Sequence, residues 1–203
     1  MSVLKTFRIF PVPVFAYQIP DHHETNLQLR KYIYGLKEQN PKGLNISNVG
    51  GWHSPYFDIQ NDPAPKDFLL KVNKILPEVF QDVIGWEFDV KKLNIQAMWA
   101  VINEKNSFNI RHNHANSYFS AAYYVRTNEN AGQIKFFDPK EVKTMYSPRI
   151  KISTEFSTNV VKIKPEEGKL LLFPSYLHHS VEENLSDEDR IVISFNIFTI
   201  QFN

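Results

Sequence analysis

The stretch that decides the fold runs from residue 169 to residue 196 and reads KLLLFPSYLHHSVEENLSDEDRIVISFN. An apolar segment ends at a Phe-Pro turn, a short segment with two histidines follows, and a second apolar segment begins after an acidic turn. Aromatic and β-branched residues favour strands, so this pattern predicts three strands that follow one another without a helix. The same two-residue period extends back to residue 92. We predict seven strands, at 93–103, 118–126, 133–137, 160–164, 169–173, 179–182 and 191–200. Such an order predicts a mainly β protein, an antiparallel sandwich or barrel.

The first half of the chain carries the helical signals. Residues 24–38 place apolar side chains at the i, i+3, i+4, i+7 spacing of an amphipathic helix, and residues 66–84 repeat the pattern. We expect a kink in the second helix at Pro77. Residues 47–57, SNVGGWHSPYF, read as a loop or hairpin around a Gly-Gly turn. Helices confined to this half would cover one face of the β structure.

Composition excludes several classes of protein. The 203 residues have an ordinary globular composition, and 23 basic minus 22 acidic side chains give a net charge of +1. This balance disfavours nucleic acid as a partner. With no cysteine, disulfide scaffolds, thiol nucleophiles and iron–sulfur clusters are excluded. No apolar run is long enough to span a membrane and no leader peptide is evident, so we expect a cytoplasmic protein with no membrane partner.

The connection between the predicted strands that end at 137 and begin at 160 is long and polar. Connections of this length are usually lids or mobile loops, and we expect residues 139–157 to be the most mobile part of the chain and to lie over the mouth of a site. Its basic side chains could meet an anionic partner, although solvated charge is the favoured interpretation.

His112 and His114 are the first pair suited to metal binding. At i and i+2 on an extended strand, both imidazoles point to one face and can reach one ion. Neutral imidazole suits iron, zinc, copper or nickel, yet a His-x-His pair alone is a weak signal. His53 is interpreted as a core or loop histidine. His22 and His23 precede the first helix and are interpreted as surface or capping residues.

The second group lies in the deciding stretch, where His179 precedes Arg190 by eleven residues. A histidine from a distant strand would complete a three-point face on a metal, and the planar guanidinium suits a bidentate carboxylate. The alternative is a structural histidine and an arginine paired with an acid of the turn between them. His178 should face away from the metal, because adjacent strand residues point to opposite faces.

These motifs resemble a known superfamily. The segments NIRHNHANSYFSAAYYV, GQIKFFDP and GKLLLFPSYLHHSV, followed by Arg190 and SFN, are similar to the Fe(II)/2-oxoglutarate-dependent oxygenases, in particular to small bacterial and phage oxygenases related to prolyl hydroxylases. The resemblance implies a double-stranded β-helix, also called a jelly-roll and similar to the cupin fold. It also implies one domain over residues 1–203, with a helical support region at 1–90 and a catalytic core at 91–203.

The resemblance implies a role for each matching residue. His112, His114 and His179 match the ligands of Fe(II). Arg190 matches the basic residue that holds the distal carboxylate of 2-oxoglutarate. Its implied hydrogen-bonding neighbours are Tyr124, Ser194 and Asn196. The implied reaction is hydroxylation of a small-molecule or peptide substrate, coupled to decarboxylation of 2-oxoglutarate to succinate; the sequence identifies neither this substrate nor the oligomeric state, for which a homodimer is one option.

One residue departs from the superfamily pattern, which usually has Asp or Glu where this chain has His114. Three neutral ligands leave the metal centre one unit more positive, and Asp138 is an alternative third ligand. Two rival functions follow. One is a cupin-type metal enzyme with three histidines that does not use 2-oxoglutarate. The other is a non-catalytic jelly-roll binding module whose histidines are structural.

Overall fold

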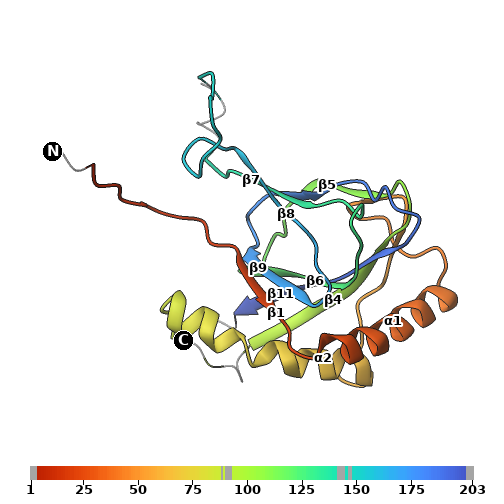
Figure 1. Ribbon diagram of the computed structural model, residues 1–203. Helices are drawn as coiled ribbons and strands as arrows, with labels where there is room; N and C mark the ends of the chain where they lie inside the picture. Colours follow the sequence, from red (N-terminus) through yellow and green to blue (C-terminus); the bar gives the residue numbers. More distant parts are fainter. Residues whose placement is uncertain (1–3, 88, 90–92, 141–144, 146–147, 200–203) are drawn as a thin grey trace.

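A computed structural model describes residues 4–87, 89, 93–140, 145 and 148–199 of the chain. Two antiparallel sheets face each other in these residues (Figure 1). The six-stranded sheet has the order β1 (Phe15–Gln18), β9 (Lys169–Pro174), β6 (Phe119–Arg126), β11 (Arg190–Thr199), β4 (Leu93–Asn103), β3 (Trp52–His53). The five-stranded sheet has the order β2 (Asn48–Val49), β5 (Phe108–His112), β10 (His179–Val181), β7 (Ile134–Phe137), β8 (Val160–Ile163). The predicted mainly β, jelly-roll-like fold is confirmed, and all seven predicted strands are present.

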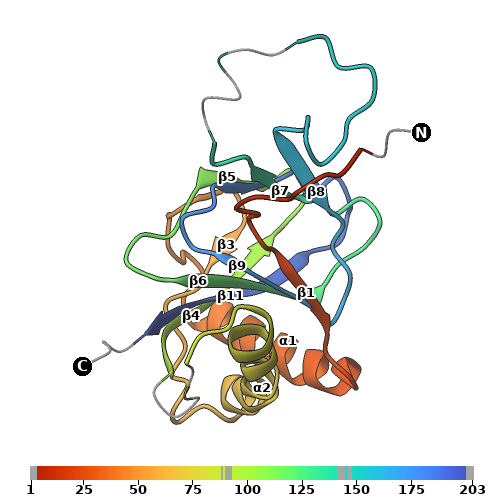
Figure 2. The same cartoon turned by 90° about the vertical axis from the view of Figure 1, so that its left-hand side faces the viewer.

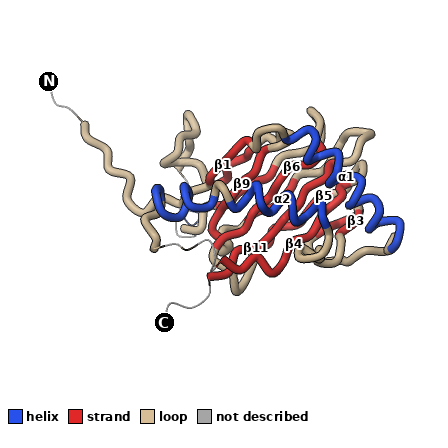
Figure 3. Tube along the Cα trace, turned by 90° about the horizontal axis from the view of Figure 1, so that it is seen from below, coloured by secondary structure: helices blue, strands red, loops and turns tan. Residues whose placement is uncertain are grey.

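Two helices, α1 (His22–Gln39) and α2 (Pro63–Asn73), cross the outer face of the six-stranded sheet (Figure 3). The second predicted helix is divided, because α2 ends before Pro77 and a separate π-helical turn, η1 (Glu78–Val83), follows it. α2 begins at a proline, which the first helical turn tolerates since its N–H groups have no intrahelical partner. None of the helices among the described residues combines the length and the apolarity needed to cross a bilayer.

The six-stranded sheet is buried on both faces. Along β6, Ala121, Tyr123 and Val125 join the apolar core beneath the helices, whereas Ala122 and Tyr124 join a second core between the two sheets. This two-residue alternation follows from the pleat of a strand. From Phe119 to Val125, the odd-numbered positions of β6 therefore support the helices, and Ala122 and Tyr124 face the interior between the sheets.

The Gly50-Gly51 turn joins the two sheets and does not form a hairpin. β2 pairs with β5, where Asn48 lies opposite Asn109, whereas β3 pairs with β4, where Trp52 lies opposite Ile102. Both glycines have positive φ, and a Cβ at Gly51 would meet the Ile102 carbonyl oxygen. Only glycine fits this crossing, and it brings residues of the 1–90 region into both sheets. That region is therefore more than a helical support, because β1, β2 and β3 all belong to it.

The described part of the long connection lies elsewhere than expected. Residues at its two ends, within 138–140 and 155–159, line a groove together with the N-terminal segment, next to β7 and β8 (Figure 2), and Arg8 pairs with Glu155 at 3.1 Å. None of these described residues lines the cavity that contains the three histidines. Residues 141–144 and 146–147, part of the expected lid, lie outside the described residues.

The contact between α2 and the sheet yields a prediction about stability. The Phe68 side chain is fully buried, with its ring 4.6 Å from that of Tyr123 and 6.4 Å from that of Phe195. Phe68→Ala leaves a cavity between helix and sheet, so we expect it to lower the free energy of unfolding by about 3–5 kcal/mol. Leu70→Ala on the exposed side of α2 is the matched control. Urea denaturation measures both, and equal losses for the two variants would contradict the packing described here.

Candidate metal centre

Three histidines meet between the two sheets. His112 ends β5 and His179 begins β10, and the two residues are register partners across these antiparallel strands. His114 follows β5 by two residues, and its backbone N–H donates to the Ser175 carbonyl at 2.9 Å. The ring centroids are 4.3 Å apart for His112 and His179, 5.2 Å for His112 and His114, and 5.1 Å for His114 and His179. One nitrogen from each ring lies within 4.8 Å of the others, a spacing that suits a shared metal ion.

Hydrogen bonds fix which nitrogen of each ring is available. The Nδ1 atom of His112 lies 2.8 Å from the Ile110 carbonyl oxygen, and that of His179 lies 3.0 Å from the Leu177 carbonyl oxygen. The Nδ1 atom of His114 lies 2.6 Å from Oδ1 of Asn196. Each oxygen is an acceptor, so each Nδ1 carries the proton and donates it. The lone pair of each neutral ring is then on Nε2, which leaves three Nε2 atoms as donors to a metal.

Burial keeps the three rings neutral. It lowers the pKa of His179 to about 3 and that of His114 to about 4, and it also lowers the pKa of His112. The repulsion between the imidazolium forms of neighbouring histidines acts in the same direction. The Phe173 ring packs 4.8 Å from the His179 ring and contributes to this dry environment. Neutral imidazole is the form that binds metals.

His114, which replaces the usual carboxylate, is held by a network of its own. Oδ1 of Asn196 accepts from Nδ1 of His114 and also from the hydroxyl of Ser120, at 2.9 Å. The Ser120 hydroxyl lies 2.9 Å from the same Nδ1 and 2.7 Å from the hydroxyl of Ser175. Both serines are fully buried; Ser120 belongs to β6, and Ser175 directly follows β9. The network therefore fixes the tautomer and the orientation of His114.

The histidines line a cavity of about 360 Å³ between the sheets. Tyr124, Ser194 and Asn196, which the sequence placed near a cosubstrate, line the same cavity. Asn196 is already engaged with His114, whereas Tyr124 and Ser194 face the remaining space. The His53 ring is buried and stacks on Trp99, with the ring centroids 5.9 Å apart. Both residues line the cavity, so His53 lies beside the three histidines.

Arg190 is fully buried at the start of β11, close enough to Tyr124 for an electrostatic interaction, and is not among the residues that line the cavity. Its Nη1 donates to the carbonyl oxygens of Ala131 and Glu182, the latter at 3.2 Å. Its Nε and Nη2 are buried without a hydrogen-bond partner. Burial lowers the pKa of Arg190 to about 10, which leaves it charged at neutral pH. A buried cation with two unpartnered donor nitrogens, Nε and Nη2, is energetically costly. A carboxylate matches the fork geometry of these two donors.

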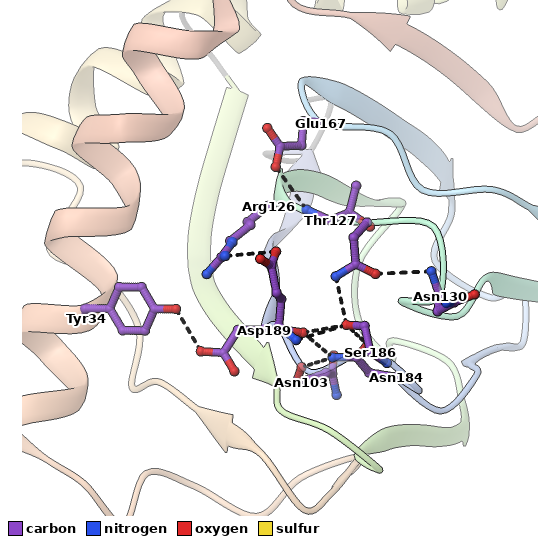
Figure 4. Close-up of polar contacts among 11 residues, drawn as sticks. Tyr34, Asn103, Arg126, Thr127, Asn130, Glu167, Asn184, Ser186 and Asp189 are labelled. Carbon is purple, nitrogen blue, oxygen red and sulfur yellow. Dashed lines mark hydrogen bonds and ion pairs between the residues drawn. The ribbon is translucent and has the colours of Figure 1, made fainter.

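The acids of the 182–189 turn pair with other partners. Glu182 pairs with Lys162 at 2.7 Å and Glu188 with Arg126 at 2.9 Å, while Asp189 accepts from the Tyr34 hydroxyl at 2.7 Å (Figure 4). The buried Asn184 closes the turn by donating to the Asn103 and Glu188 carbonyls, both at 2.8 Å. An ion pair between Arg190 and these acids, the structural alternative considered from the sequence, is not formed among these residues.

The remaining candidates take other places. Asp138 is absent from the cluster of potential metal ligands found in the described residues, and one of its carboxylate oxygens accepts from the Lys140 backbone N–H at 2.9 Å. His178 is also outside that cluster. Ser120, Ser175 and Trp99 were not predicted from the sequence, although Ser120 shares the strand face of Tyr124. A polar residue on the interior face of a buried strand was the available signal.

Comparisons with known proteins indicate the family and the fold. Residues 97–196 match the model of a family described as "Putative 2OG-Fe(II) oxygenase". No curated protein matches the chain. Among solved structures, a prolyl-4-hydroxylase of Pseudomonas putida is 12% identical, covers 94% of each chain and has a TM-score of 0.66. HygX of Streptomyces hygroscopicus, with nickel and 2-oxoglutarate bound, is 13% identical over 95% of this chain and 85% of its own, with a TM-score of 0.64.

A third similar structure is SnoK, an alpha-ketoglutarate-dependent carbocyclase from nogalamycin biosynthesis. It is 10% identical, covers 93% of this chain and 80% of its own, and has a TM-score of 0.65. At these identities the structures establish the fold. Together with the family match and the histidine cluster, they place the chain in the superfamily of Fe(II)- and 2-oxoglutarate-dependent oxygenases.

The network around His114 yields a prediction about metal affinity. Asn196→Leu removes the acceptor that fixes the His114 tautomer, so we expect Mn²⁺ affinity to fall by about 10–100-fold, the usual effect of losing an outer-shell partner. Asn196→Asp supplies a charged acceptor and should retain or strengthen binding. Ser194→Ala, on the same face of β11, is the control in the absence of 2-oxoglutarate. Isothermal titration with Mn²⁺ measures all three, and parental affinity in Asn196→Leu would contradict this role.

Proposed function

We propose that this oxygenase is a hydroxylase in which His112, His114 and His179 hold Fe(II), and in which Arg190 and Tyr124 hold the distal carboxylate of 2-oxoglutarate. Ser194 is proposed as a further contact for the cosubstrate. The bound iron would supply oxygen activation coupled to decarboxylation of 2-oxoglutarate to succinate. The protein's own residues bind, orient and exclude water.

The main support for the metal assignment is the set of three Nδ1–H donations. Each imidazole uses Nδ1 for an oxygen acceptor and keeps Nε2 free, and the three rings lie within 4.8 Å of one another through their ligand atoms. A purely structural histidine in a core would be expected to satisfy both nitrogens. Three rings with one free nitrogen each, all at the same place, favour a metal site over the non-catalytic binding module.

The support for 2-oxoglutarate is Arg190. Nη1 is used by two backbone carbonyls, whereas Nε and Nη2 remain without partners although they are buried. A cupin-type enzyme that does not use a carboxylate cosubstrate would supply no group to pair with the Nε and Nη2 atoms of Arg190. Tyr124, also buried, lies close enough to Arg190 for its charged form to raise the pKa of the guanidinium. A distal carboxylate held by both residues would satisfy the unpaired donors.

The metal assignment is tested by substitution of each ligand. Loss of an inner ligand should cost more than loss of an outer-shell partner, so we expect His112→Ala and His179→Ala to lower Mn²⁺ affinity by more than about 100-fold. His114→Asp should retain binding, since it restores the common pattern of two histidines and one carboxylate. His178→Ala is the matched control. Calorimetry with Mn²⁺ gives the affinities, and parental binding by His114→Ala would remove His114 from the ligand set.

The cosubstrate assignment is tested at Arg190. Arg190→Lys keeps the charge and can donate to the carbonyls of Ala131 and Glu182, but it lacks the fork. We expect it to weaken 2-oxoglutarate binding by about 1.5–3 kcal/mol, the value of a hydrogen bond to a charged group, with a small change in thermal stability. Calorimetric titration of the Mn²⁺-loaded protein with 2-oxoglutarate gives this difference, and succinate formation with product analysis tests the hydroxylation. Unchanged 2-oxoglutarate affinity would exclude the clamp.

A further inference from the structure

The outer end of the histidine cavity is bordered by exposed apolar side chains. Leu44, Ile46, Tyr56 and Ile110 all line the cavity, with exposed fractions of 40%, 67%, 67% and 49%. We call these four residues the apolar rim. Three of them belong to the chain before and after the Gly50-Gly51 crossing, and Ile110 belongs to β5. Exposed apolar side chains gathered at the mouth of a cavity are typical of a binding surface.

An aromatic wall leads inward from this rim. The Tyr56 ring lies 6.0 Å from the Trp99 ring, and Trp99 is stacked with His53 at an interplanar angle of 12°. The Trp99 ring in turn lies 5.7 Å from the ring of His114. A flat group that enters at the rim can therefore slide along Trp99 to the histidine cluster. Offset stacking on such rings favours apolar and aromatic faces.

The cavity lining contains no Lys, Arg, Asp or Glu among the described residues. Arg111, next to the rim residue Ile110, is turned away, with its guanidinium 4.4 Å from the centroid of the Phe137 ring. A cationic group brought into this lining would lose its water without gaining an opposite charge, because none of the lining residues is an acid, and this is strongly unfavourable.

From the rim, the wall and the uncharged lining, we infer that the substrate inserts an uncharged, apolar group of about the size of one ring, and that the site rejects cationic groups. This inference rests on the proposed function for the position of the reacting group. The cavity of about 360 Å³ is at the small end of the range for ligand sites and must also admit 2-oxoglutarate. Only one group of the substrate therefore enters, and the rest lies against the apolar rim.

Benzamide and benzamidine test this selectivity, since they have the same shape and differ in charge at neutral pH. Both are titrated into the protein by saturation-transfer NMR, with and without Mn²⁺ and 2-oxoglutarate. We expect benzamide to bind at least about tenfold more tightly than benzamidine, because the cation has no partner in the lining. Equal binding, or preference for benzamidine, would overturn the inference.

A charge placed on the rim should reverse the preference. Ile46→Glu adds an acid to the mouth, and we expect it to raise benzamidine affinity and lower benzamide affinity, each by several-fold. Ile152→Glu is the matched control, because Ile152 is similarly exposed, at 71%, and does not line the cavity. The same response in both variants would show that the probes do not bind at the rim and would overturn the inference.

The two proposals fail in different ways. If calorimetry finds no binding of Mn²⁺ or 2-oxoglutarate while the metal-free protein still prefers benzamide and Ile46→Glu reverses that preference, the proposed function is wrong and the apolar binding site stands. If Mn²⁺ and 2-oxoglutarate bind but benzamidine competes equally with benzamide, the proposed function stands and the substrate class is wrong.

Discussion

The arrangement of the site depends on the burial of one sheet on both of its faces. Along β11, Ile191, Ile193 and Phe195 belong to the core beneath the helices, so the alternate residues must face the interior between the sheets. Those alternate residues include Arg190, Ser194 and Asn196. A slip of one residue in the pairing of β11 would place a guanidinium under the helices and isoleucines in the cavity. The helices thus fix the register that puts the polar residues of the site inside.

Backbone carbonyls are the main hydrogen-bond acceptors that orient the polar side chains in this interior. Two of the three imidazoles donate to carbonyls two residues earlier in the chain, and Arg190 donates to two carbonyls of neighbouring loops. Such acceptors are rigid because the strands and turns that carry them are already fixed. His114 is the exception, since its acceptor is the side chain of Asn196, itself held by Ser120. The ligand that departs from the superfamily pattern is therefore the one with a dedicated side-chain network.

Much of this could be predicted from the sequence, for physical reasons that differ between elements. The strands of the C-terminal half have a clear two-residue period, and 93–103 coincides with β4. β5 was missed because FNIRH is short and the burial along it runs against residue polarity, with Asn109 buried and Ile110 exposed; the short β2 and β3 were missed because their pairing depends on partners distant in sequence. The Asn196–Ser120–Ser175 network was not predicted for the same reason, because its hydrogen bonds join residues up to 76 positions apart in the sequence. The described ends of the 138–159 connection contact the N-terminal segment, and no local sequence pattern predicts that contact.

Acids of the 182–189 turn form ion pairs with Lys105, Arg126 and Lys162 at the surface, whereas the buried Arg190 has no ion-paired carboxylate among the described residues. The three imidazoles of the metal site are neutral, so the described part of the interior carries a positive charge that its own residues do not balance. A divalent metal would increase this imbalance, and a dicarboxylate would relieve it at both ends. The absence of an acid at position 114 therefore makes the interior more dependent on its anionic cosubstrate than a site with a carboxylate ligand would be.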